Sequence, residues 1–193
     1  MSELAEAQAP ARTPEGDLWV FAYGSLLWRP DFPFNDKRPA WIDGWRRALC
    51  VYSWVHRGVR ERPGLVLGLD PGGETHGALY RVSATHVEAT LEYLRWRELR
   101  TDAYSAHAVT AALTDTQLTA LTFVANRASD QYAGVLSLER QAKIVVEAEG
   151  ESGPNPDYVR AAAAHLREAG MADPDLDALV ARLDTGRESP AGA

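Results

Sequence analysis

Cysteine is almost absent from this chain of 193 residues, which contains only Cys50. A single cysteine excludes an intrachain disulfide and a cysteine-rich zinc site. Long apolar runs are missing as well, because the uncharged stretch 18–28 is too short to cross a bilayer. No basic segment followed by an apolar one marks a secretory signal. We therefore expect a cytoplasmic protein that does not act at a membrane.

Lysine is also scarce, with two residues against 18 arginines. The net charge of −7 argues against a nucleic-acid binder, which is normally basic. Residues 28–62 are an exception, with eight basic and four acidic side chains. This excess predicts either a local field that attracts a small anion or a solvated face of a sheet.

Motifs that hold nucleotides or metals are missing. Neither G-x-x-x-x-G-K-[ST] nor G-x-G-x-x-G occurs, so a nucleotide cofactor has no support. Glu74 and His76 are two possible metal ligands without a third, and we expect no metal site. Ser25 does not lie in a G-x-S-x-G elbow, which leaves a serine hydrolase unsupported.

The residues that are present are typical of a globular protein, with 46% hydrophobic side chains. The length suits one domain, which we place at residues 17–184. Residues 1–16 are rich in Ala, Glu and Pro without apolar periodicity and predict a flexible N-terminal arm. Residues 185–193 predict a short disordered tail.

Strand patterns dominate the first part of the domain. The expected strands cover residues 18–22, 40–52, 65–69, 78–82, 103–113 and 118–125. Asp70-Pro71-Gly72-Gly73 predicts a hairpin between the third and fourth of these strands, and a short polar connection predicts another between the last two.

Helical patterns follow. Residues 85–99 predict a helix with Thr85 and Glu88 at capping-box spacing. Residues 138–149 predict a second helix with Ser137 as its N-cap. A C-terminal pair begins at Asn155 and at Asp173, each followed by proline. Strand hairpins with separate helices predict an α+β fold, for which a small barrel is one arrangement.

Glu98 lies on the apolar face of the expected helix 85–99. Val87, Leu91 and Leu94 recur at helical spacing, and four further residues lead to Glu98. Burial on this face and the nearby helix C-terminus both predict a raised carboxyl pKa. Such a group is a candidate general acid or base. The alternative is a structural ion pair with one of the neighbouring arginines, Arg95, Arg97 and Arg100.

The segment Tyr23-Gly24-Ser25-Leu26 directly follows the first expected strand. Glycine permits a positive φ, and successive N–H groups in such a turn can form a nest for an oxyanion or a carboxylate. The alternative is an ordinary glycine turn at the end of a strand.

Several short motifs, taken in order, resemble those of the ChaC-type gamma-glutamylcyclotransferases. They are Val20-Phe21-Ala22-Tyr23-Gly24-Ser25-Leu26-Leu27-Trp28, Arg57-Gly58, Pro63-Gly64-Leu65-Val66-Leu67, Gly77-Ala78-Leu79-Tyr80-Arg81, Tyr93-Leu94-Arg95-Trp96-Arg97-Glu98, Tyr132-Ala133-Gly134 and Gly150-Glu151-Ser152-Gly153-Pro154-Asn155 with Asp157-Tyr158. The resemblance extends over residues 19–179. Two positions depart from the family pattern: Ala22, where glycine is frequent, and Glu74-Thr75-His76, where a small residue and cysteine are common.

The resemblance implies a small mixed β-barrel with flanking helices and an enzyme that needs no metal and no cofactor. It implies cleavage of glutathione to 5-oxoproline and cysteinylglycine, with Glu98 as the catalytic acid and base. The residues implied to bind the gamma-glutamyl group are Val20, Phe21, Ala22, Tyr23, Gly24, Ser25 and Leu26. Arg47 and Arg57 are candidates for contact with the glycine carboxylate. Glutathione is therefore the expected partner, and nucleic acid and membranes are not.

Two other functions stay open at this point. The same cyclisation could serve other gamma-glutamyl amines or amino acids, because Glu98 and the turn act only on the shared gamma-glutamyl half. A non-catalytic binding or regulatory module is the third alternative, which the presence of both the turn and Glu98 disfavours.

Overall fold

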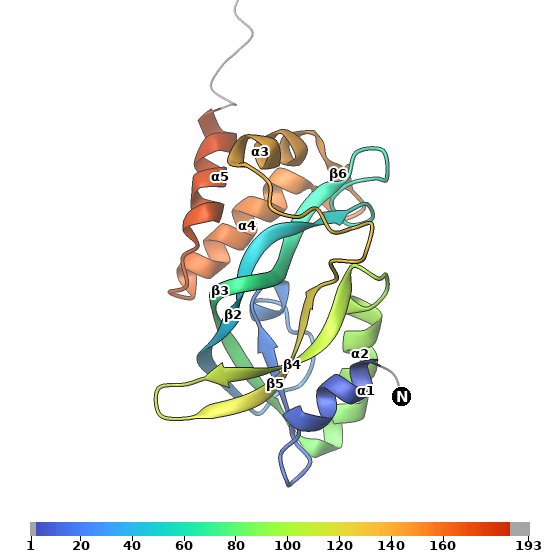
Figure 1. Cartoon of the computed structure of the whole chain (residues 1–193), viewed down its shortest axis with the longest axis vertical. Helices are drawn as coiled ribbons and strands as arrows, with labels where there is room; N and C mark the ends of the chain where they lie inside the picture. The colour runs from blue at the N-terminus through green and yellow to red at the C-terminus, as the bar shows by residue number, and fades with distance from the viewer. Residues whose placement is uncertain (1–2, 186–193) are drawn as a thin grey trace, which may run out of the picture. The chain divides into compact units, whose positions relative to one another are not determined.

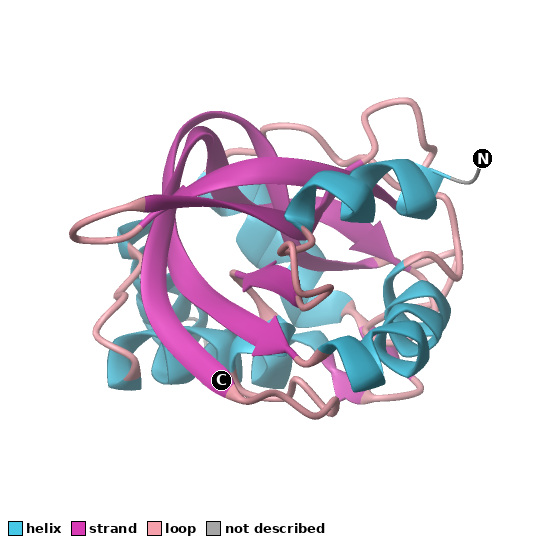
Figure 2. Cartoon of the chain, turned by 90° about the horizontal axis from the view of Figure 1, so that it is seen from below, coloured by secondary structure: helices cyan, strands magenta, loops and turns pink. Residues whose placement is uncertain are grey.

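Five strands close into a barrel in the computed structural model, which describes residues 3–185 (Figure 1). In the order of the barrel they are β1 (Leu18–Ala22), β3 (Gly64–Val82), β2 (Asp36–Ser53), β4 (Tyr104–Ala112) and β5 (Gln117–Ala125). The parallel pairing of β1 with β5 closes the barrel, with Val20 opposite Leu121. Figure 2 shows the curvature of these strands. The expected α+β fold with a small mixed barrel is confirmed.

The chain forms two compact units. The single domain over residues 17–184 stays a prediction. Unit 1 consists of Met1–Arg47 and Gly68–Asp130. Unit 2 consists of Ala48–Leu67 and the residues from Gln131 onward. β2 and β3 each begin in one unit and end in the other. Of the expected tail, residues 186–193 lie outside the described part of the chain.

β1 is the most deeply buried strand of unit 1. All five of its residues are buried, as expected for an apolar run with a strand on both sides. Gly77 of β3 has to be small, because a Cβ there would lie 2.3 Å from the carbonyl oxygen of Ala22. The first expected strand is confirmed, and so is the β4–β5 hairpin.

The predicted hairpin at Asp70-Pro71-Gly72-Gly73 is wrong, because β3 runs through it without reversing. Residues 78–82 pair with β1. Gly72 and Gly73 adopt positive φ values of 103° and 75°. These backbone conformations, which glycine allows, let β3 bend at this point. Asp70 itself is fully buried, with Arg46 and Arg127 as ion-pair partners at 2.7 and 2.8 Å.

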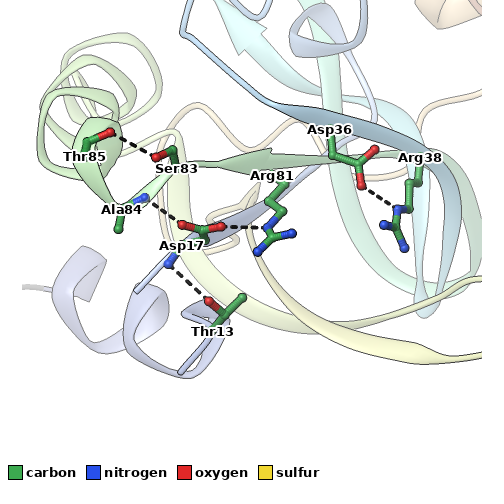
Figure 3. Close-up of polar contacts among 8 residues, drawn as sticks. All are labelled: Thr13, Asp17, Asp36, Arg38, Arg81, Ser83, Ala84 and Thr85. Carbon is green, nitrogen blue, oxygen red and sulfur yellow. Dashed lines mark hydrogen bonds and ion pairs between the residues drawn. The ribbon is translucent and has the colours of Figure 1, made fainter. Parts of the chain in front are cut away.

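A buried aspartate, Asp17, holds the segment that leads into the helix with Glu98 (Figure 3). A short helix, η3 (Ala84–His86), leads into α2 (Val87–Glu98). Asp17 accepts hydrogen bonds from the Ala84 N–H at 2.8 Å and from Arg81 Nε at 2.7 Å. The predicted capping box is wrong, because the Glu88 carboxylate pairs with Arg12 instead. Asp17 therefore ties the start of β1 to the end of β3 and to the start of α2.

The N-terminal segment contains helical structure where the sequence pattern predicts a flexible arm. α1 (Glu3–Gln8) is followed by η1 (Ala9–Ala11), and α1 lies against β4 (Figure 1). Leu4, Ala7 and Ala11 are buried. Glu3 accepts a hydrogen bond from the Ala106 N–H at 2.6 Å. Two of these three buried residues are alanines, so the apolar periodicity is weak in the sequence.

Unit 2 contains the remaining helices. They are α3 (Leu138–Glu147), α4 (Asn155–Glu168) and α5 (Pro174–Thr185), with the short strands β6 (Glu149–Gly150) and β7 (Gly153–Pro154) before α4. The three helices contact one another. The three expected helical regions are confirmed, and so are the caps Ser137 and Asp173.

Asn155 is not the N-cap that the sequence pattern predicts. It lies inside α4, fully buried, and its amide binds the backbone of Leu65 through the N–H at 2.7 Å and the carbonyl at 2.8 Å. Glycines allow the backbones to approach here. A Cβ on Gly64 would lie 2.2 Å from the Arg57 carbonyl oxygen, and one on Gly150 would lie 2.6 Å from the Gly58 nitrogen. These motif residues therefore serve packing within unit 2.

Asp17→Ala is expected to lower the unfolding free energy by about 3 kcal/mol, because it leaves Arg81 and the Ala84 N–H without a buried acceptor. Asp36→Ala is the matched control. It breaks the more exposed pair with Arg38, drawn in the same view (Figure 3), and should change stability by less than about 1 kcal/mol. Urea unfolding of both variants measures the difference. Equal losses would contradict the anchoring role of Asp17.

Candidate active site

β1 ends in a turn whose amide groups are available. After Ala22 come Tyr23 and Gly24, and a short helix, η2 (Ser25–Leu27), follows. Within residues 3–185, the N–H groups of Gly24, Ser25 and Leu26 donate no hydrogen bond. Gly24 has φ −125°, so the turn does not use the positive φ that glycine permits. Three successive free N–H groups on a mostly buried turn can bind an anion.

The carbonyl groups around this turn, in contrast, are held by side chains. Arg47 Nε donates to the Tyr23 carbonyl at 2.8 Å, and Arg97 Nη1 donates to the Arg29 carbonyl at 2.6 Å. The Leu27 carbonyl accepts from Tyr80 Oη at 2.8 Å and from Lys37 Nζ at 3.2 Å. The backbone of the turn is thus fixed through its acceptors, and its donors keep one orientation. A preorganised set of donors costs no reorganisation when charge develops opposite it.

The expected binding residues before the turn lie in the core of the barrel. Val20, Phe21 and Ala22 are each 0% exposed. The Phe21 carbonyl accepts a hydrogen bond from Thr122 Oγ1 at 3.0 Å. These residues pack and pair within the barrel, and they place the turn at the end of β1.

Glu98 is the last residue of α2. Val87, Leu91 and Leu94 are buried, which confirms the predicted inner face of this helix. The Glu98 side chain is only 15% exposed. Burial raises the pKa of its carboxyl above the usual range, and the charge and hydrogen bond of Arg97 oppose that rise. A carboxyl with a raised pKa is a stronger proton acceptor than an exposed one, which is what a general base requires.

Arg97 connects the two parts of the site. Its Nε lies 3.2 Å from Oε1 of Glu98, and its Nη2 donates to Oγ of Ser25 at 2.9 Å. The structural ion pair considered as an alternative for Glu98 is therefore present, with Arg97 as its partner. The sequence pattern offers Arg97 only as one of three possible partners, and it does not show the second contact with Ser25.

The other candidate side chains are engaged elsewhere. Arg47 donates to the carbonyls of Tyr23 and His76, and Arg57 donates to Ser152 O at 2.6 Å within unit 2. Among the residues that the structure describes, no group of three or more His, Cys, Asp or Glu side chains could hold a metal ion. None of the described helices is long and apolar enough to span a membrane.

Glu98→Gln is expected to raise the melting temperature at about pH 7, because it removes a carboxylate whose ionisation burial disfavours. A carboxyl with a raised pKa in the folded chain stabilises fully below its unfolded pKa, and this contribution is lost as the pH rises through the folded pKa. The difference between variant and wild type should therefore shrink toward about pH 4. Thermal unfolding at both pH values measures it, and a difference independent of pH would contradict the burial of an ionisable group.

Comparison with known proteins places this chain in a family. The model of the ChaC-like protein family matches residues 18–185. The chain is 34% identical over 194 residues to glutathione-specific gamma-glutamylcyclotransferase 1 of Mus musculus, covering 94% of this chain and 87% of the mouse protein. It is 31% identical over 175 residues to the glutathione-specific gamma-glutamylcyclotransferase of Escherichia coli K12, covering 90% and 76%. A yeast gamma-glutamyl cyclotransferase specific to glutathione has the same fold, with a TM-score of 0.81 at 21% identity over 92% of this chain and 100% of the yeast chain. The chain therefore belongs to the ChaC-like family.

Proposed function

We propose that this protein cleaves glutathione into 5-oxoproline and cysteinylglycine, with Glu98 as the general acid and base. The observation that carries the proposal is the link between a largely buried carboxylate and a turn with three free amides. The names of the similar mouse and E. coli proteins support the choice of glutathione. The single cysteine suits a reducing compartment, and we place the reaction in the cytoplasm.

The reaction joins two groups of one molecule. The α-amine nitrogen of the gamma-glutamyl group attacks the γ-carbonyl carbon, and a new lactam C–N bond closes a five-membered ring. The amide C–N bond to cysteine then breaks, and its electron pair goes to the leaving nitrogen. Because nucleophile and electrophile belong to one substrate, holding the substrate in a folded conformation is the main task of the enzyme.

Glu98 carries protons from the attacking nitrogen to the leaving nitrogen. The substrate amine is largely protonated at neutral pH, so its nitrogen loses one proton before attack and a second one as the lactam N–H forms. The leaving nitrogen gains two protons and departs as the ammonium group of cysteinylglycine, and Glu98, which accepts and returns these protons one at a time, ends as the carboxylate. The direction of the Glu98 pKa shift suits the first step, since burial makes the carboxylate a stronger proton acceptor. No atom changes its oxidation state, so the reaction needs no oxidant or reductant.

The turn supplies the complementary positive potential. The N–H groups of Gly24, Ser25 and Leu26 fit one of two anions, the oxyanion of the tetrahedral intermediate or the α-carboxylate of the substrate. One oxyanion donor typically lowers a barrier by about 3 kcal/mol. Bound to the α-carboxylate, the same groups would fix the attacking amine instead.

Glu98→Gln is expected to lower kcat at least a hundredfold while glutathione still binds, because an amide of the same size cannot take up the proton. The measurement is release of 5-oxoproline and cysteinylglycine by mass spectrometry, with wild type and variant side by side. Glu92→Gln, an exposed change on the same helix, is the control and should keep full activity. Near-normal turnover by Glu98→Gln would contradict the assignment of Glu98 as the general base.

Glutathione is expected to exceed gamma-glutamylalanine in kcat/KM by at least about tenfold, because the smaller substrate lacks the thiol and the glycine carboxylate. A panel that also contains a gamma-glutamylamine measures this selectivity. Equal values across the panel would show a general gamma-glutamyl cyclase. No turnover of any compound, with a retained binding partner, would favour the non-catalytic module.

A further inference from the structure

We propose that Arg97 is a positioning residue that holds the Glu98 carboxylate and the Ser25 turn in one fixed arrangement for cyclisation. This inference rests on the proposed function. Its basis is the set of contacts made by one guanidinium with α2, with η2 and with the segment that follows η2.

The Arg97 guanidinium uses all three of its nitrogens. Nε lies 3.2 Å from Glu98 Oε1, and Nη2 donates to Ser25 Oγ at 2.9 Å. Nη1 donates to Tyr93 Oη and to the Arg29 carbonyl, both at 2.6 Å. The side chain is 17% exposed. A planar group with partners on every side has one orientation, so the positions of Glu98 and Ser25 depend on each other.

The chemistry explains why this coupling matters. The base has to reach the substrate amine while the γ-carbonyl or the α-carboxylate lies over the turn amides. Glu98 and the turn belong to elements far apart in the chain, since 72 residues separate Ser25 from Arg97. A misplacement of about 1 Å can reduce a rate by about a hundredfold. Lysine keeps the charge but is a single point donor, and it cannot reproduce the fork that contacts both partners.

Arg97 also sets the electrostatic environment of Glu98. It is the charge that opposes the effect of burial on the pKa of Glu98. The other groups that face the pair are Asp31, whose carboxylate lies 3.5 Å from Arg97 and is 57% exposed, and the phenol of Tyr93. η2 contributes the uncharged Ser25. Removal of Arg97 therefore leaves the carboxylate buried without its counter-charge, and protonation persists to higher pH.

The test measures kcat against pH at saturating glutathione for Arg97→Gln, Arg97→Lys and the control Arg95→Gln. Arg95 is an exposed arginine on the same helix, so its variant removes an equal charge outside the site. For Arg97→Gln, we expect kcat to fall about a hundredfold, with KM changed far less, and the acid limb of the kcat profile to move to higher pH. For Arg97→Lys, the limb should stay near the wild-type position while kcat falls about tenfold. Arg95→Gln should match the wild type in both.

Each outcome decides between the two proposals. A wild type without cyclase activity overturns the proposed function and this inference together. An active wild type with Arg97→Lys at the wild-type kcat overturns the positioning role alone. If circular dichroism shows that Arg97→Gln does not fold, the lysine variant and Ser25→Ala decide. Their effects on kcat should be less than additive in the double variant, because both break the same link. Full additivity would overturn the inference.

Discussion

Removal of the Glu98 carboxylate from water is the constraint on which the site depends. Burial at the end of α2 raises its pKa and so disfavours the ionised form that the proposed base needs. Arg97 supplies the opposing charge and at the same time fixes the turn through Ser25. The helix that carries both residues is anchored at its other end by Asp17, which binds the Ala84 N–H. A tie between β1, β3 and the start of α2 thus holds the helix that carries the proposed proton-transfer group.

The turn after β1 shows a division between backbone acceptors and donors. The carbonyl oxygens of the turn and of the residues after it accept hydrogen bonds from four side chains, Arg47, Lys37, Tyr80 and Arg97. The N–H groups of Gly24, Ser25 and Leu26 stay available. Mostly buried backbone groups without partners are costly in a folded protein, and this cost supports the proposal that the three amides bind an anion. The donors to these carbonyls lie on β2, β3 and α2, so three elements of unit 1 contribute to the shape of one short turn.

Local pattern was sufficient to predict the elements that carry the site. The apolar run before Tyr23 predicts β1, and the spacing from Val87 to Glu98 predicts the buried face of α2, because both signals lie within a few residues. The hairpin at Pro71 failed for the opposite reason. Positive φ at Gly72 and Gly73 is compatible with reversal or with bending, and only the pairing of residues 78–82 with β1 decides between them. Asn155 and Arg97 likewise have partners 90 and 72 residues away, which no local pattern can reveal.

The family motifs therefore contain residues of two physical kinds. Gly58, Gly64, Gly150 and Asn155 let backbones meet inside unit 2, where a single added methyl group would overlap backbone atoms or the Asn155 amide. A substitution there acts on activity only through folding, and its effect on turnover should disappear once the folded fraction is taken into account. Under the proposed mechanism, substitutions at Glu98 and Arg97 change proton transfer and its geometry, so they should leave a folded protein with altered kcat. Shared motifs by themselves cannot separate these kinds, but a stability measurement beside each rate does, because only the second kind changes the rate of molecules that are fully folded.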